Sequence, residues 1–112
     1  MDSTERDRFA TLIQNQIAAL DDADDAGQMG QKTVMLDQQS VGRLSRQDAL
    51  LNQSMARATQ ARRDALRTGL RAALSRLEQG DYGDCDECGD PIPTRRLELD
   101  PTVTRCVSCA QG

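Results

Sequence analysis

The sequence predicts a mainly α-helical protein, in which an antiparallel helical hairpin (a coiled coil) precedes a small C-terminal module with four cysteines. Three observations predict this fold. Apolar residues recur at helical spacing in two long stretches, all four cysteines lie in the last third of the chain, and the 112 residues include only one Phe, one Tyr and no Trp. With so few large apolar side chains, an apolar ribbon between two helices is more plausible than a thick globular core.

The first helix is expected to begin at Asp2 or Ser3, because Asp2 and Glu5 have the spacing of a capping box. Its apolar stripe consists of Phe9, Leu12, Ile13, Ile17 and Leu20. We expect this helix to end near Gly27 and Gly30, since glycine commonly terminates helices.

The second helix is expected to run from Ser45 to Gln79, with Asp48 favoured near its start by the helix dipole and Gly80 as the stop. Its predicted seam has the four-and-three steps of a heptad. The seam residues are Met55, Arg62, Leu66, Leu70, Ala73 and Leu77.

Antiparallel pairing would place Phe9 opposite Leu77 and Asp24 opposite Arg62, and would bury Leu66. The acidic run Asp21, Asp22, Asp24 and Asp25 would then neutralise Arg62, Arg63 and Arg67. Each exposed ion pair of this kind contributes only ~0 to 1 kcal/mol. Residues 27–44 have two interpretations. They fold back and cap the seam at Leu50, Leu51 and Met55, or they form a probe at the far end of the hairpin.

The cysteines form two CxxC pairs, Cys85/Cys88 and Cys106/Cys109, separated by residues 89–105. Two such turns can close a tetrahedral cage of four thiolates with Zn–S distances of about 2.3 Å. Four thiolates leave no open coordination position, so we expect one structural Zn²⁺. The alternative is a pair of disulfides or a redox-active CxxC.

A metal would help this last segment to fold, because chains below about 40 residues rarely build a sufficient core alone. The predicted core of the module is Tyr82, Ile92, Leu97, Leu99, Val103 and Val107. We therefore expect two parts, a hairpin over 1–79 with its tip at about 27–45, and a four-cysteine zinc-finger module over 80–112.

The net charge is −4 and the pI is near 4.7. An acidic chain without a basic stripe is not expected to bind a particular nucleic-acid sequence by itself. We find neither the pattern of a signal peptide nor an apolar run long enough to span a membrane, so a cytoplasmic monomer with no membrane association is expected.

The segment Gly80-Asp-Tyr-Gly-Asp-Cys-Asp-Glu-Cys-Gly-Asp-Pro-Ile-Pro, followed by Arg-Arg-Leu-Glu at 95–98 and the second CxxC pair, resembles the zinc finger of the DksA/TraR family. The preceding hairpin fits the same family. The resemblance implies a non-enzymatic regulator that binds bacterial RNA polymerase through its secondary channel, with the hairpin tip near the active centre. It implies an allosteric effect on transcription.

Well-known members of the family carry an Asp-x-x-Asp-x-Ala motif at the tip, and the matching positions here are Gly42, Ser45 and Gln47. None is the expected residue, although Asp48 and Ala49 lie close by. The candidate tip contacts with polymerase are Arg43, Ser45, Arg46, Asp48 and Ala49.

The family also binds ppGpp through basic residues, and the positions that match are Arg62, Gly69, Asp100 and Ala110. Only Arg62 is positively charged, so we predict a weak response to ppGpp with Arg62 as the one residual contact. Two other classes of function remain open. One is a zinc-stabilised interaction module that binds polymerase or another partner without regulating transcription, and the other is a thiol redox protein.

Overall fold

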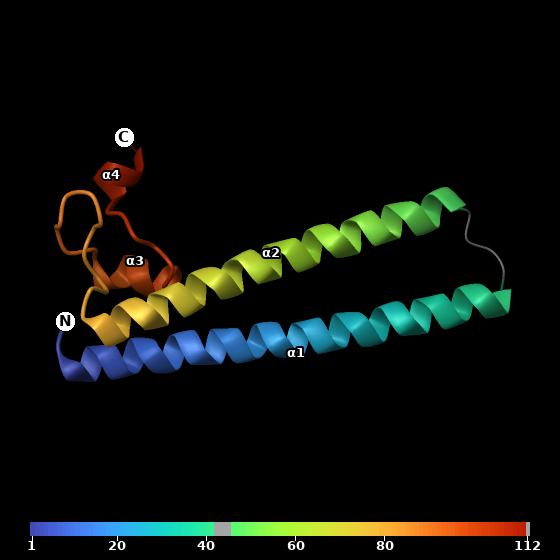
Figure 1. The fold of residues 1–112 in the computed structure, drawn as a ribbon, viewed down its shortest axis with the longest axis horizontal. Coiled ribbons are helices and arrows are strands. Elements are labelled where there is room, and N and C mark those ends of the chain that lie inside the picture. The colour runs from blue at the N-terminus through green and yellow to red at the C-terminus, as the bar shows by residue number, and fades with distance from the viewer. Residues whose placement is uncertain (42–45, 112) are drawn as a thin grey trace. The chain divides into compact units, whose positions relative to one another are not determined.

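The computed structural model describes residues 1–41 and 46–111, and it describes side chains within these ranges except for 28–41. The helices are α1 (Ser3–Val41), α2 (Arg46–Gln79), α3 (Thr94–Leu99) and α4 (Val107–Gln111), and an isolated antiparallel bridge joins Asp84 to Pro91 (Figure 1). The predicted mainly α-helical class is confirmed. None of these described helices is both long and apolar enough to cross a bilayer.

The chain divides into two compact units. Unit 1 combines Met1–Ile17 with Leu66–Gly112, and unit 2 is Ala18–Ala65. Helices α1 and α2 therefore contribute to both units, and in each they run antiparallel (Figure 1). Unit 1 also contains the whole cysteine-rich segment with α3 and α4.

The start of α1 agrees with the sequence, because the Glu5 backbone N–H donates to Asp2 Oδ1 over 2.8 Å. The predicted end near Gly27 and Gly30 is wrong, since α1 continues to Val41. A glycine inside a helix costs only about 1 kcal/mol relative to alanine, which neighbouring helix formers can offset. Gly27 has a packing role as well, because a Cβ there would lie 3.2 Å from Nη1 of Arg63.

Helix α2 ends at Gln79, as predicted, in a Schellman motif. Gly80 has a φ of 81°, its N–H donates to the Leu77 carbonyl over 3.3 Å, and the Asp81 N–H donates to the Arg76 carbonyl over 2.9 Å. The left-handed conformation explains why glycine occupies this position. The predicted start at Ser45 lies outside the described residues.

The core belongs to unit 1. Its buried apolar residues are Phe9, Ile13, Leu70, Ala73, Leu77, Tyr82, Cys85, Ile92 and Leu97. The predicted seam residues Leu70, Ala73 and Leu77 are thus confirmed as buried. Three residues of the predicted module core, Tyr82, Ile92 and Leu97, are confirmed as well. The two sets meet where the Phe9 and Tyr82 rings lie 5.7 Å apart with a tilt of 54°. Leu99 and Val107 are corrections, because they are 84% and 46% exposed.

The N-terminal part of the predicted seam on α2, which comprises Met55, Arg62 and Leu66, is wrong. The partly buried positions lie one residue further along the helix. Met55 and Leu66 are 61% and 42% exposed, whereas Gln60 and Arg63 are half-buried. Correspondingly, Asp24 pairs with Arg63 over 3.6 Å. Arg63 lies one residue beyond Arg62, which the predicted register placed opposite Asp24, and it is one of the arginines expected to neutralise the acidic run. Leu50 and Leu51 are exposed as well. The two interpretations of residues 27–44 depend on side chains that lie outside those described.

Candidate metal centre

The two cysteine pairs lie on turns of different construction. In the first, the Gly89 N–H donates to the Cys85 carbonyl over 2.9 Å, and Gly89 has a φ of 77°. In the second, the Ala110 N–H donates to the Cys106 carbonyl over 2.9 Å within the short helix α4. A helical turn needs no left-handed residue, which explains why glycine follows the first pair and alanine follows the second.

Three contacts outside the cysteines join these turns. The Asp86 backbone N–H donates to the Thr104 carbonyl over 2.8 Å. The Arg105 guanidinium pairs with Glu87 over 3.1 Å and with Asp86 over 3.9 Å. The residue before Cys106 is thereby fixed against the loop between Cys85 and Cys88. Sequence alone did not predict these pairings, because nothing in the spacing selects acidic partners for Arg105.

The four sulfur atoms form one cluster. All four Sγ atoms lie within 4.8 Å of one another, and those of Cys88 and Cys106 are 3.7 Å apart. In a tetrahedral site with Zn–S bonds of about 2.3 Å, the sulfur atoms are separated by about 3.8 Å. The cluster therefore has the dimensions of a four-thiolate zinc site.

The electrostatics of the cluster also favour a cation. Backbone N–H groups of Cys88 and Cys106 lower the pKa of Cys85 to about 6. Contact with the Cys106 sulfur, and then with those of Cys85 and Cys88, raises the pKa of Cys109 well above its usual range. Thiols this close cannot all ionise by themselves, and a divalent cation at their centre removes that penalty.

The site is thus built for one structural zinc. The chemistry that Zn²⁺ supplies here is cross-linking, since four thiolates occupy its tetrahedral positions. The described cysteines contain no disulfide. Cys85 is buried against the core, whereas Cys88 is exposed, so one side of the cluster faces the interior of unit 1.

A close contact holds the segment after α3 against α2. A Cβ on Gly69 would lie 3.2 Å from Cγ2 of Thr102, so a larger residue there would require Thr102 to shift by a few tenths of an ångström. Asp100 Oδ1 accepts hydrogen bonds from the Thr102 N–H over 3.1 Å and from its hydroxyl over 2.6 Å. The Tyr82 hydroxyl donates to the Pro101 carbonyl over 2.9 Å. Gly69 and Asp100, two of the positions matched to ppGpp contacts, therefore both lie beside Thr102 in this chain.

The other predicted site residues belong to unit 2. Arg46 and Asp48 are exposed in the first turn of α2, and Ala49 is half-buried there. Arg43 and Ser45 lie outside the described residues. Arg62 is exposed on α2.

Comparison with known proteins agrees with this geometry. The sequence model of the prokaryotic DksA/TraR C4-type zinc finger matches residues 80–112. The solved structure of transcription factor DksA2 from Pseudomonas aeruginosa is 30% identical, with a TM-score of 0.70 over 99% of this chain and 84% of that one. A transcriptional regulator from Chlamydia trachomatis, described as an RNA polymerase binding protein, has a TM-score of 0.55 at 20% identity and supports the fold alone.

Curated relatives match over shorter segments. RNA polymerase-binding transcription factors DksA from Haemophilus influenzae and Caulobacter vibrioides are 45% and 42% identical over 40 and 53 residues. These segments cover 36% and 47% of this chain but only 28% and 37% of those two proteins.

The fold and the thiol cluster define a helical protein with a C4-type zinc finger. The match to DksA2 over most of both chains extends the relationship beyond the finger. The chain belongs to the DksA/TraR family.

Proposed function

We propose that this protein is a DksA-like transcription regulator that binds bacterial RNA polymerase through its secondary channel, with the tip of the hairpin near the active centre. The observation that carries this proposal is the similarity to transcription factor DksA2 over 99% of the chain. The relatives from Haemophilus influenzae and Caulobacter vibrioides, which are RNA polymerase-binding transcription factors DksA, support it further.

In this proposal the chain acts by binding and positioning, as a cytoplasmic monomer without catalysis. Zinc and the core of unit 1 fix the ends of α1 and α2 that carry Phe9, Leu70 and Leu77. The exposed side chains of Arg46 and Asp48 at the start of α2 make the contacts with polymerase, together with Arg43, Ser45 and Ala49. A carboxylate or guanidinium at such a contact changes the relative stability of polymerase conformations only if it binds them unequally.

The first test is binding of the zinc-loaded protein to bacterial core RNA polymerase in competition with a known secondary-channel factor. A matched variant has residues 33–48 replaced by Gly and Ser. Mutual exclusion that depends on residues 33–48 would support the proposed mode. Absence of binding by a correctly folded protein would contradict it.

A second test separates regulation from binding. The substitution Asp48→Asn removes one charge and keeps the size of the side chain, so polymerase binding should persist while the effect on transcription is lost. Asp64→Asn, on the same helix, is the control and should leave both unchanged. If Asp48→Asn still regulates transcription, other tip residues must act. If the unaltered protein binds polymerase without regulating transcription, it is an interaction module.

The weak response to ppGpp remains a prediction of the same proposal. Gly69 offers no side chain and Asp100 is negatively charged and bonded to Thr102, so neither supplies a cation for phosphate. Transcription assays with and without ppGpp should differ little in the presence of this protein. A several-fold gain that disappears in Arg62→Ala would show that Arg62 alone suffices.

A further inference from the structure

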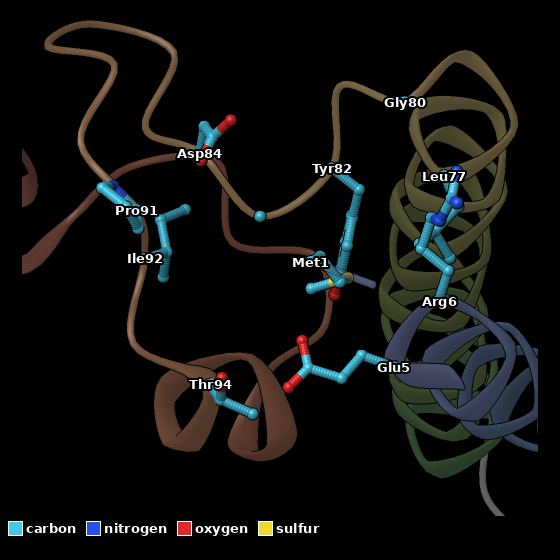
Figure 2. Close-up of a pocket in the computed structure, with 11 residues that line it drawn as sticks. Met1, Glu5, Arg6, Leu77, Gly80, Tyr82, Asp84, Pro91, Ile92 and Thr94 are labelled. Atoms are coloured by element: carbon cyan, nitrogen blue, oxygen red, sulfur yellow. The ribbon is translucent and has the colours of Figure 1, made fainter. Parts of the chain in front are cut away.

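The two cysteine turns differ in how firmly unit 1 holds them. The first turn projects from a base in which Asp84 and Pro91 form an antiparallel bridge (Figure 2). The Cys85 N–H donates to the Asp90 carbonyl over 2.8 Å and closes the turn above this base. Cys85 and Ile92 are 3% and 4% exposed and belong to the core. The first turn therefore rests directly on the core of unit 1.

The second turn has no comparable support. It comprises Cys106 and the five-residue helix α4, none of whose residues is buried. Cys106 and Cys109 are half-buried, and Val107 between them is 46% exposed. A short helix without a buried apolar side chain gains little from packing. The position of the second turn therefore depends on polar contacts and on the metal.

Arg105 supplies most of these polar contacts. Its guanidinium pairs with Glu87 over 3.1 Å and with Asp86 over 3.9 Å, and both acids lie between the first two cysteines. Its carbonyl accepts a hydrogen bond from Nε of Arg96 over 3.3 Å. One residue earlier, the Thr104 carbonyl accepts from the Asp86 N–H over 2.8 Å. Arg105 thus connects the second turn both with the first turn and with α3.

The charges near the metal give Arg105 a second effect. A zinc ion with four thiolate ligands is negatively charged overall. Asp86 and Glu87 on the first turn therefore repel the thiolates of the second turn. The guanidinium of Arg105 belongs to the second turn and attracts these same acids. Without Arg105, the side chains of the two turns would favour separation.

We propose that Arg105 is a positioning residue of the zinc site, which slows release of the metal by holding the second cysteine turn against the first. Zinc is then lost by detachment of Cys106 and Cys109, while the first turn remains in place on the core. The pair of Arg105 with Glu87 is about half-exposed on both sides, and solvent weakens such pairs. The inference does not depend on the proposed contact with polymerase.

The test is the rate of zinc release from the zinc-loaded full-length protein to a metallochromic pyridylazo chelator, in an excess at which the rate no longer depends on its concentration. Arg105→Gln should accelerate release about three- to tenfold, less than the effect of removing a group bonded directly to a ligand. Arg95→Gln removes the same charge from an exposed position of α3 and should leave the rate unaltered. An unaltered rate in Arg105→Gln, or an equal acceleration in Arg95→Gln, would overturn the proposal.

A double-mutant cycle tests the ion pair itself. In a Glu87→Gln background, Arg105→Gln should accelerate zinc release by a smaller factor than in the unaltered protein, because its nearer partner is already neutral. The same factor in both backgrounds would overturn the proposal.

Amide hydrogen exchange in the zinc-loaded protein separates local opening from a general loss of stability. Arg105→Gln should accelerate exchange of the Asp86 N–H, which is bonded to Thr104. It should leave exchange of the Cys85 N–H unaltered, because this group is bonded to Asp90 within the first turn. Equal acceleration at both amides would mean that the substitution destabilises the whole module, and would overturn the proposal.

Discussion

Units 1 and 2 contain the same two helices, yet they are stabilised differently. Among the residues whose side chains are described, every buried one identified as core lies in unit 1. In unit 2 the partly buried positions include Asp24, Gln60 and Arg63, and the pair Asp24–Arg63 connects α1 with α2. Burial of a large apolar side chain contributes about 1.5–3 kcal/mol. The Asp24–Arg63 pair is separated by 3.6 Å, which is too long for a good hydrogen bond, so it contributes less.

Folding therefore depends mainly on unit 1. The surface of unit 2 is available for binding. Leu51 and Met55 illustrate the difference, because they are large and apolar but add little to the core. Substitutions in unit 1 should therefore affect stability first, and those in unit 2 should affect partners first.

The largest effect is expected from loss of zinc. Either a strong chelator or Cys106→Ser should unfold much of residues 81–111, because structural zinc in small fingers contributes roughly 10–16 kcal/mol of binding free energy. Hydrogen exchange followed residue by residue, together with zinc release, measures this. Ser108→Ala, between two ligands, is the control and should retain the metal. Equal loss of hydrogen-exchange protection in units 1 and 2 would contradict the proposed difference in stability between them.

The next effect concerns matched leucines on α2. Leu70 is fully buried in unit 1 and Leu51 is 59% exposed in unit 2. Leu70→Ala should lower the free energy of unfolding by about 2–5 kcal/mol. Leu51→Ala should change it by no more than about 0.5 kcal/mol. Denaturant titrations of the two variants give both values, and similar losses would contradict the division.

A smaller effect should appear at high pH. Burial raises the pKa of Tyr82 from 10.0 to about 12, while Arg76 acts in the opposite direction. The folded state thus holds the phenol proton more tightly than the unfolded state. Its contribution to stability is full below pH 10 and is lost as the pH rises through 12. Tyr82→Phe should remove this pH dependence in thermal denaturation, and an unchanged profile would exclude Tyr82 as its origin.

The smallest effect should come from the ion pair of unit 2. Because the Arg63 Nη1 and Asp24 Oδ1 atoms are 3.6 Å apart, beyond a good hydrogen bond, a double-mutant cycle with Asp24→Asn and Arg63→Gln should give a coupling free energy of about 1 kcal/mol or less. Coupling comparable to the loss in Leu70→Ala would mean that unit 2 has a stabilising centre of its own.

The sequence predicted the zinc cluster and the lower seam well because both have strict geometric requirements. Four thiolates at fixed spacing admit few arrangements, and Gly89 and Gly80 adopt the positive φ expected of turn and cap residues. Phe9 and Leu77 are large enough to identify the buried face without help from their neighbours.

The N-terminal part of the seam on α2 was not predictable in the same way. Met55 and Leu66 have heptad spacing, but Gln60 and Arg63 fit the same period one residue away. Periodicity alone does not tell which face meets α1. Helical spacing puts Gly69 on the face of Leu66, and within unit 1 Gly69 lies beside Thr102. Which face of α2 packs on α1 and which packs on the last segment is decided by tertiary contacts. The continuation of α1 through Gly27 is a tertiary effect as well.

The contacts of α1 also bear on how the protein is made. Phe9 packs on Tyr82, and Arg8 forms an ion pair with Glu98 over 3.0 Å, so residues at the start of α1 find their partners among residues synthesised much later. Contacts between distant parts of a chain slow folding because the intervening loop must first be closed. A nascent chain that stalls before Tyr82 therefore lacks the surface on which Phe9 packs, and unit 1 can form only after most of the chain has been translated.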